Sequence, residues 1–230
     1  MKLRVIVVLG ILFLVGQVNA QEKLVLKNQK EKVSYIIGTD IGGNFKRQSV
    51  DVDPNILAKG IQDALSGAKL LLTKEEIQEA MVAFQKEMTE KQKQRGETFL
   101  SENKKKEGVK TLPSGLQYKV VKAGTGKKPK LNDTVTVHYR GTLIDNTEFD
   151  SSFRRGQPAT FPVSGVIPGW TEALQLMEEG AKWQLFIPPN LAYGERGAGG
   201  LVGPNATLIF EIELISVQEN KQEKRQENKK

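Results

Sequence analysis

The stretch Gly165-Val166-Ile167-Pro168-Gly169-Trp170 decides how the rest of the chain is interpreted. Two β-branched residues precede a Pro-Gly turn, after which Trp170, Leu174 and Met177 recur at helical spacing. The pattern predicts a turn leading into a short helix with one apolar face, which Gly180 ends. A tryptophan at the start of such a helix can pack in an ordinary core or form the floor of a cavity. Trp170 alone favours ordinary packing, because tryptophan side chains are usually well buried.

The segments on either side of this stretch show the alternation of apolar and polar residues that is typical of β-strands. They span residues 134–139, 182–187 and 208–214. In the last of them Glu211 and Glu213 fall between large apolar residues, so we expect the two glutamates on the solvent face. These segments predict a sheet with one buried face.

Five short motifs follow one another in this region. They are V-H-Y-R-G-T-L from Val137, E-F-D-S-S from Glu148, V-I-P-G-W from Val166, L-A-Y-G from Leu191 and A-T-L-I-F from Ala206. Together they resemble the FKBP family of peptidyl-prolyl cis-trans isomerases, over residues 108–217. The region before them is similar to the N-terminal arm of the macrophage-infectivity-potentiator subclass of exported bacterial members.

The resemblance implies an α+β fold. A helical N-terminal dimerisation arm with a long connecting helix would be followed by an antiparallel sheet of about five strands, wrapped around one short helix. It also implies prolyl isomerase activity on proline-containing polypeptides, assistance to the folding of exported proteins, and inhibition by rapamycin-class macrolides. The alternative is a holdase chaperone or surface interaction module that uses the FKBP frame for binding only.

The resemblance further implies which residues form the proline pocket. Trp170 would be its floor, and Asp150 and Tyr193 would be polar groups at its rim. The catalytic set carried over is Tyr139, Phe149, Asp150, Ile167, Trp170, Tyr193 and Phe210, with Val166 and Leu201 contacting the substrate. Ala159 stands where many eukaryotic members carry an aromatic ring, which lowers one wall of the pocket and leaves the substrate preference open.

Prolyl isomerisation requires no nucleophile in the site. Rotation about the X–Pro bond faces a barrier of ~20 kcal/mol that comes from amide resonance. The twisted transition state has lost this resonance and is less polar, so an apolar pocket that strips water from the amide favours it. We therefore expect no cofactor and no metal. His138 is the single histidine and there is no cysteine, so a His or Cys cluster cannot form; we expect structural roles for His138 and for Trp183.

Residues 1–20 have the pattern of a signal peptide. Lys2 and Arg4 precede an apolar run over 5–15, and Val18-Asn19-Ala20 supplies a small-residue cleavage site. The run is shorter than the ~20 residues that span a bilayer, and we expect no transmembrane segment. The pattern predicts an exported protein, in the periplasm or associated with the outer membrane or cell surface.

Residues 21–107 are expected to be helical. Asp53 before Pro54 predicts a helix start, and Gly67 its end. Thr73 and Glu76 form a capping box that opens a long helix, expected to continue to residue 106.

The long helix has two parts that differ in character. An apolar face marks its first turns from Ile77 to Met88, whereas the segment after Thr89 is mostly polar. We interpret the second part as a solvent-bridging helix or flexible linker, in which Gly96 is a weak point.

The helical arm carries too little apolar material to be stable as an isolated monomer. Gly38 and Gly42, spaced four residues apart, favour the close approach of another helix. We therefore expect a homodimer through residues 21–107.

The charged residues are of mixed sign, with a formal net charge of +7 over the 230 residues. They show no basic–aromatic pattern of nucleic-acid binding. The last segment, 218–230, is expected to be a disordered charged tail.

Overall fold

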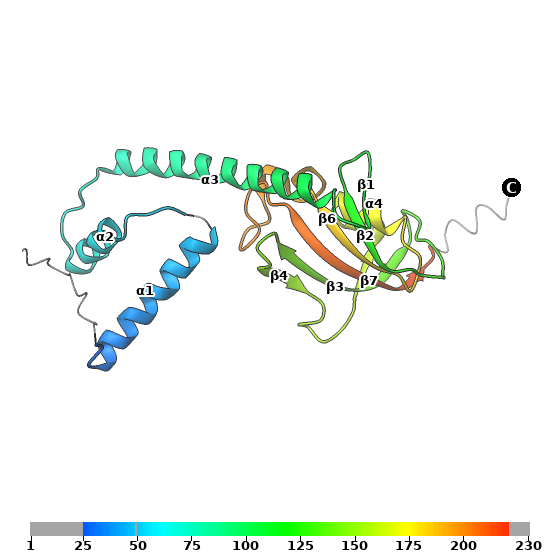
Figure 1. Cartoon of the computed structure of the whole chain (residues 1–230), viewed down its shortest axis with the longest axis horizontal. Coiled ribbons are helices and arrows are strands. Elements are labelled where there is room, and N and C mark those ends of the chain that lie inside the picture. The colour runs from blue at the N-terminus through cyan, green and yellow to red at the C-terminus, as the bar shows by residue number, and fades with distance from the viewer. Residues whose placement is uncertain (1–24, 49, 221–230) are drawn as a thin grey trace, which may run out of the picture. The chain divides into compact units, whose positions relative to one another are not determined.

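The computed structural model describes residues 25–48 and 50–220 (Figure 1). The chain divides into two compact units, one ending at Asp51 and the other beginning at Val52. The helices are α1 (Gln29–Gln48) in the first unit, and α2 (Pro54–Ser66), α3 (Lys74–Asn103) and α4 (Pro168–Leu174) in the second. The predicted signal peptide and the last ten residues of the predicted tail lie outside the described residues.

The second unit contains a seven-stranded sheet in which every pairing is antiparallel. Its strands are β1 (Val109–Thr111), β2 (Gln117–Lys122), β3 (Thr134–Leu143), β4 (Glu148–Ser151), β5 (Ala159–Pro162), β6 (Lys182–Ile187) and β7 (Leu208–Gln218). The strand order is β1-β2-β6-β7-β3-β4, and β5 pairs with β3. The expectation of about five strands is too low, because β1, β4 and β5 are too short to produce a clear alternation in sequence.

Capping residues fix ends of the second unit's first two helices, as the sequence predicts. Asp53 accepts a hydrogen bond of 2.7 Å from the N–H of Asn55, and Gly67 follows α2 in the left-handed conformation (φ 66°). The Thr73 and Glu76 side chains form the predicted capping box at the start of α3. These caps satisfy backbone groups that a helix end leaves without partners.

The C-terminal turns of α3 pack on the sheet (Figure 1). Gly96 and Asn103 are buried, and the ring of Phe99 lies 6.0 Å from the ring of Phe186 on β6. The interpretation of the segment after Thr89 as a solvent-bridging helix or flexible linker is therefore wrong for residues 96–103. The helix also ends at Asn103, three residues before the predicted end.

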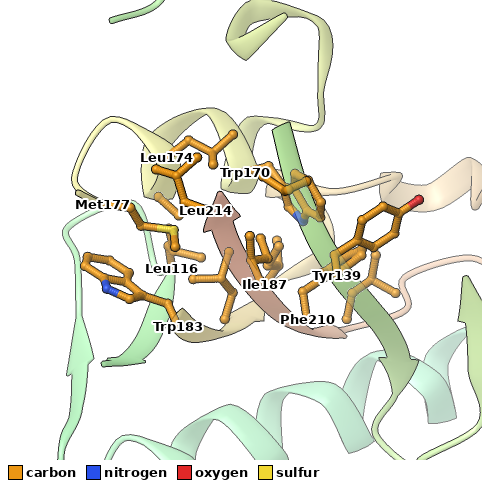
Figure 2. Packing of buried hydrophobic residues seen from close by; sticks show 14 of the residues in the cluster. Leu116, Tyr139, Trp170, Leu174, Met177, Trp183, Ile187, Phe210 and Leu214 are labelled. Atoms are coloured by element: carbon orange, nitrogen blue, oxygen red, sulfur yellow. The ribbon is translucent and has the colours of Figure 1, made fainter. Parts of the chain in front are cut away.

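The core lies between the sheet and α4 (Figure 2). Its buried apolar residues on β3, β6 and β7 face the side chains of Trp170, Ala173 and Leu174 on α4. The predicted alternation of β7 is confirmed, since Leu208, Phe210, Ile212 and Leu214 are all buried. This core holds the start of α4 against the sheet, and that placement positions the candidate site.

Gly169 allows α4 to approach the sheet closely. A Cβ atom at this position would lie 2.6 Å from Cγ2 of Ile187, well inside van der Waals contact. The helix ends at Leu174 rather than at Gly180 as predicted. Met177 is nonetheless fully buried, because the turn after α4 continues over the core.

No helix formed by residues 25–48 and 50–220 is both long and apolar enough to cross a membrane. Gln218, the first residue of the predicted tail, is instead the last residue of β7. The Asn220 N–H donates a hydrogen bond of 3.1 Å to Oδ1 of Asp133, which ties the end of the described chain to the sheet domain.

Candidate functional site

A cavity of about 430 Å³ opens beside the N-terminus of α4. It is lined by Tyr139, Phe149, Asp150, Phe161, Gly165, Val166, Ile167, Trp170, Tyr193 and Phe210. The structure thus brings together eight of the nine residues that the resemblance assigned to the pocket. Leu201 is not among them, and its side chain is 56% exposed in the loop before β7.

Trp170 lines the cavity and lies beside Tyr139 and Phe210, which line it as well (Figure 2). Its side chain is only 4% exposed, and the ring centroids of Tyr139 and Phe210 each lie 5.1 Å from the Trp170 ring at nearly perpendicular angles. Phe161 makes a similar edge-to-face contact at 5.9 Å. Such perpendicular contacts are the favoured geometry of aromatic pairs, so the three rings hold the indole in one orientation.

Gly141 on β3 makes room for two rings of the cavity wall. Phe149 on β4 and Phe210 on β7 meet edge to face with centroids 5.5 Å apart. A Cβ atom on Gly141 would lie 2.7 Å from Cζ of Phe149 and 2.7 Å from Cε1 of Phe210. The glycine in the motif V-H-Y-R-G therefore has a steric reason, because any other side chain would displace both rings.

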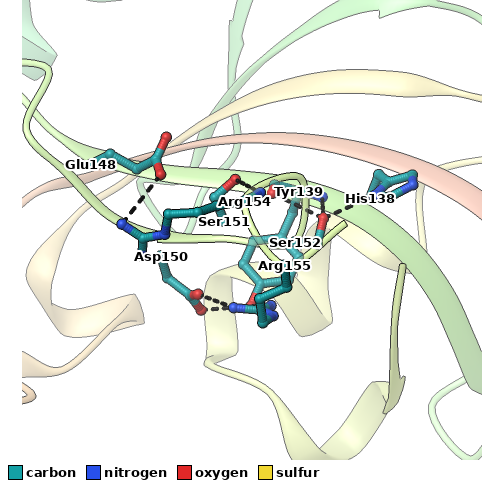
Figure 3. A network of polar contacts seen from close by, with 8 residues as sticks. All are labelled: His138, Tyr139, Glu148, Asp150, Ser151, Ser152, Arg154 and Arg155. Carbon is teal, nitrogen blue, oxygen red and sulfur yellow. Dashed lines mark hydrogen bonds and ion pairs between the residues drawn. The ribbon is translucent and has the colours of Figure 1, made fainter. Parts of the chain in front are cut away.

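A polar network forms one edge of the cavity (Figure 3). The Tyr139 hydroxyl donates a hydrogen bond of 2.5 Å to Oδ2 of Asp150. Arg155 donates to the Tyr139 hydroxyl at 2.7 Å, forms an ion pair with Asp150, and lies over the Tyr139 ring with Cζ 5.3 Å from its centroid. An apolar floor thus adjoins a charged, internally paired edge.

The network keeps the Asp150 carboxylate ionised. Burial acts to raise the pKa of Asp150, but the hydrogen bonds from Tyr139 and Arg155 and the charge of Arg155 outweigh it, so the pKa lies below the ordinary value. Burial, followed by the hydrogen bond to Asp150, raises the pKa of Tyr139 above its ordinary value. At neutral pH the edge of the cavity therefore carries a carboxylate, a neutral phenol and a guanidinium.

His138 lies outside this cavity, in agreement with the structural role expected from the strand alternation. Its Nδ1 is 3.0 Å from Oγ of Ser152, and its ring stacks on Phe153 at 4.6 Å. Ser152 is fully buried and accepts a hydrogen bond of 2.7 Å from the Tyr139 N–H. The pair thus fixes the loop after β4 against β3, next to the polar network.

Sequence reasoning missed Phe161, Gly165 and Arg155. The sequence does carry a signal for Phe161. Ala159 and Phe161 are two residues apart on β5 and therefore lie on the same face of the strand, and Phe161 pairs with Val135 of β3. Ala159 itself is partly buried against the core and is not among the residues that line the cavity. Arg155 has no comparable signal, since a loop brings it back over the strand that carries Tyr139.

The comparison with known proteins decides the family. Residues 30–120 match the domain amino terminal to FKBP-type peptidyl-prolyl isomerase, and residues 125–215 match the FKBP-type peptidyl-prolyl cis-trans isomerase family. The outer membrane protein MIP of Legionella longbeachae is 55% identical over 203 residues, which cover 84% of this chain and 87% of that protein. The chain belongs to the FKBP-type peptidyl-prolyl cis-trans isomerases. It catalyses the cis–trans isomerisation of peptide bonds that precede proline.

Two further relatives agree with this assignment. The peptidyl-prolyl cis-trans isomerase Mip of Coxiella burnetii is 45% identical, with coverage of 84% of this chain and 88% of the relative. The crystal structure of FkpA from Escherichia coli matches with a TM-score of 0.55 at 40% identity, and covers 84% of this chain and 99% of that one. The predicted fold, with a helical N-terminal region before the FKBP domain, is therefore confirmed.

Proposed function

We propose that the cavity around Trp170 is the place where this FKBP-type isomerase turns the X–Pro bond. The proline ring would lie on the Trp170 indole, between the walls made by Tyr139, Phe149 and Phe210, with Val166 closing one side. The observation that carries the proposal is the fixed orientation of Trp170, which three perpendicular rings hold at the bottom of an open cavity.

The chemistry of these walls suits amide rotation. Aromatic surfaces would replace water around the amide, and the less polar, twisted transition state loses less by this exchange than the planar ground state does. A proline ring held on a fixed floor lets the acyl side rotate while the rest of the substrate stays bound. Amide rotation of this kind needs no nucleophile. Among residues 25–48 and 50–220 no cluster of acidic or histidine side chains suits a metal ion.

Polar groups at the rim would orient the peptide. The Tyr193 side chain lines the cavity and is 41% exposed, so its hydroxyl is available to a substrate carbonyl. The Ile167 N–H, at the turn before α4, would bind a second carbonyl. Leu201 lies in the loop before β7, and its side chain would contact the substrate only if this loop moved toward the cavity. Asp150 would act by holding the Tyr139 ring in place through its hydrogen bond.

A matched pair of charge removals tests this assignment. Asp150→Asn keeps the shape of the side chain but removes the charge that Tyr139 and Arg155 bind, and we expect kcat/KM to fall by roughly three- to tenfold, since a hydrogen bond to a charged group is worth ~1.5 kcal/mol and partial exposure weakens it. Asp145→Asn, in the exposed turn after β3, is the control. The assay is protease-free isomerisation of a short X–Pro peptide at equal folded concentration. Equal activity in both variants would remove Asp150 from the site.

We also propose that two chains associate through residues 21–107, so that each isomerase domain over 108–217 belongs to a homodimer. Apolar side chains on α1, α2 and the start of α3 support this, since Ile36, Ile56, Leu65 and Met81 are all more than half exposed. Burying such faces against a second copy would remove them from water. Multi-angle light scattering on the chain from residue 21 decides between a dimer and a monomer.

We infer the location of the protein from its N-terminal segment. The signal-peptide pattern of residues 1–20 supports export, with the periplasm as destination and outer-membrane or surface association as a variant, in line with the name of the Legionella relative. Cell fractionation with a C-terminal tag tests this location.

A rapamycin-class macrolide should compete with the peptide for the cavity. Binding without loss of isomerase activity would instead place the macrolide site elsewhere.

The alternative role, a holdase that binds unfolded chains, would require the exposed apolar faces of the helical arm rather than the cavity. Asp150→Asn separates the two roles, because it should lower isomerisation without changing the suppression of aggregation of a proline-free client.

A further inference from the structure

The last turns of α3 present four residues to the sheet domain. Gly96, Phe99, Leu100 and Asn103 are spaced at i, i+3, i+4 and i+7, which places them on one face of the helix. Gly96 and Asn103 are buried, and Phe99 contacts Phe186 across 6.0 Å. This docking face contains only two bulky apolar residues, so contact with the sheet depends on close approach and on polar pairing.

A buried amide fixes the helix in one position along the sheet. The Gln117 side chain on β2 donates a hydrogen bond of 2.8 Å to the carbonyl oxygen of Leu100, which is near the helix end. Its Oε1 accepts a hydrogen bond of 3.0 Å from Nδ2 of Asn103. A shift of α3 by a fraction of a turn would break both bonds in a buried place, where an unpaired amide is costly.

Gly96 packs tightly against Thr207. A Cβ atom on Gly96 would lie 2.4 Å from Oγ1 and 3.4 Å from Cβ of Thr207. Thr207 is only 1% exposed, and within the described part of the chain its hydroxyl has no hydrogen-bond partner. The hydroxyl therefore contributes little by bonding, and the contact with Gly96 is steric.

The backbone connects Thr207 to two residues that line the cavity, Phe210 and Tyr193. It immediately precedes β7, on which Phe210 lies three residues later, opposite Gly141. Two residues before Thr207, the Asn205 N–H donates a hydrogen bond of 2.9 Å to the carbonyl of Gly194, the neighbour of Tyr193. A displacement of Thr207 would thus move the start of β7 and the closing bond of the loop that carries Tyr193.

We propose that α3 positions the cavity through the Gly96–Thr207 contact. Gly96 is then a positioning residue for isomerisation, which acts on Phe210 and Tyr193 through the backbone on either side of Thr207. The inference rests on the proposed function, namely that the cavity is the site of isomerisation. It assigns to the helical arm a part in setting the geometry of the active site, in addition to any part in association.

Gly96→Ala in the full chain from residue 21 tests the contact. The added methyl group has to push Thr207 away, and displacements of this kind cost activity, so we expect kcat/KM on a short X–Pro peptide to fall by about three- to tenfold. Aromatic NMR signals of Phe210 and Tyr193 should shift in the same variant. Gly60→Ala on α2 is the matched control, because a Cβ atom there meets nothing within 4 Å and both substitutions raise helix propensity.

Rescue distinguishes positioning from general damage. Thr207→Ala removes the atom that lies 2.4 Å from the new methyl, so Gly96→Ala combined with Thr207→Ala should recover both kcat/KM and the ring signals of the parent. If Gly96→Ala does not fold, Thr207→Val pushes on the same contact more gently and should give a smaller shift in the same direction.

These measurements distinguish a failure of the Gly96 inference from a failure of the proposed function. Ring signals that move without any change in kcat/KM would refute the cavity as the site, whereas the α3 contact would still position its walls. Ring signals and kcat/KM that match those of Gly60→Ala, in a variant with a lowered melting temperature, would reduce Gly96 to a stability role and overturn the inference. Failure of the double variant to recover would overturn it as well.

Discussion

The Tyr139 hydroxyl donates a hydrogen bond to Asp150 and accepts one from Arg155, so a single phenol joins both members of an ion pair. The Tyr139 ring at the same time meets the Trp170 ring edge to face at 5.1 Å. The charged edge and the apolar floor of the cavity are therefore held by one side chain, and each prediction below depends on that link or on the packing behind it.

The first prediction concerns pH. The folded-state pKa of Asp150 lies below its ordinary value of 3.8, and that of Tyr139 lies above 10.0. Neither group titrates near neutrality, so kcat/KM of the folded protein should be flat from about pH 5 to 9. A titration step within that range, measured at constant ionic strength, would contradict the assignment of the network.

The same pKa shift affects stability in acid. Because its folded-state pKa is depressed, Asp150 contributes stability that is fully present above pH 3.8 and is lost as pH falls through the lower, folded-state pKa. The free energy of unfolding of Asp150→Asn should therefore depend less on pH below about pH 4 than that of the parent. Urea unfolding at a series of acid pH values measures this difference.

The second prediction removes the cation. In Arg155→Ala the pKa of Asp150 should rise, because the variant loses a hydrogen bond and a neighbouring positive charge. We expect kcat/KM to fall by roughly two- to fivefold, since the pair is partly exposed. Carboxyl ¹³C NMR follows the pKa directly. Arg154→Ala is the matched control, because Arg154 pairs with Glu148 instead, and an equal rise there would show that the effect is not local.

The third prediction concerns Gly141→Ala. The new methyl group would lie 2.7 Å from both Phe149 and Phe210, so both rings have to move. We expect a loss of stability of about 1–3 kcal/mol and a loss of kcat/KM greater than tenfold. Gly203→Ala, where a Cβ atom meets nothing within 4 Å, is the control for replacing a glycine at a position that has room for a side chain. Unchanged activity in Gly141→Ala would show that these rings do not form the working wall.

The fourth prediction follows from the docking of α3. A chain that starts at residue 107 lacks the helix that covers Phe186 and Thr207, whereas a chain that starts at residue 92 keeps it. We expect the shorter chain to be less stable by about 2 kcal/mol or more, from the apolar area it exposes. Urea unfolding followed by tryptophan fluorescence gives the difference. Equal stabilities would mean that the contact with α3 is incidental.

Local patterns in the sequence predicted most of the fold. The alternation of β3 and β7, the caps at Asp53 and Thr73, and the turn before Trp170 each depend on neighbours in the chain, and the structure confirms them. The family motifs assign to the pocket eight residues that line the cavity.

What the sequence did not show depends on contacts between distant segments. The docking face of α3 has the right helical spacing, but Gly96 and Asn103 are not apolar, so the sequence pattern favours a linker. Arg155 reaches Tyr139 only because the loop after β4 folds back over β3. A glycine that allows close approach and a glycine that weakens a helix look the same in sequence.

The most direct test of the account compares the two tryptophans. Trp170 and Trp183 are both buried in the same domain, but Trp170 lines the cavity while Trp183 stacks on Tyr118. Trp170→Leu and Trp183→Leu should each cost stability, on the order of 3 kcal/mol. The deciding measurement is the cis–trans exchange rate of a short X–Pro peptide by NMR, at equal concentrations of folded protein. We predict a loss of at least about tenfold for Trp170→Leu and near-parent rates for Trp183→Leu. Parent-like catalysis by Trp170→Leu, or equal losses in the two variants, would contradict the claim that the cavity above Trp170 is the active site.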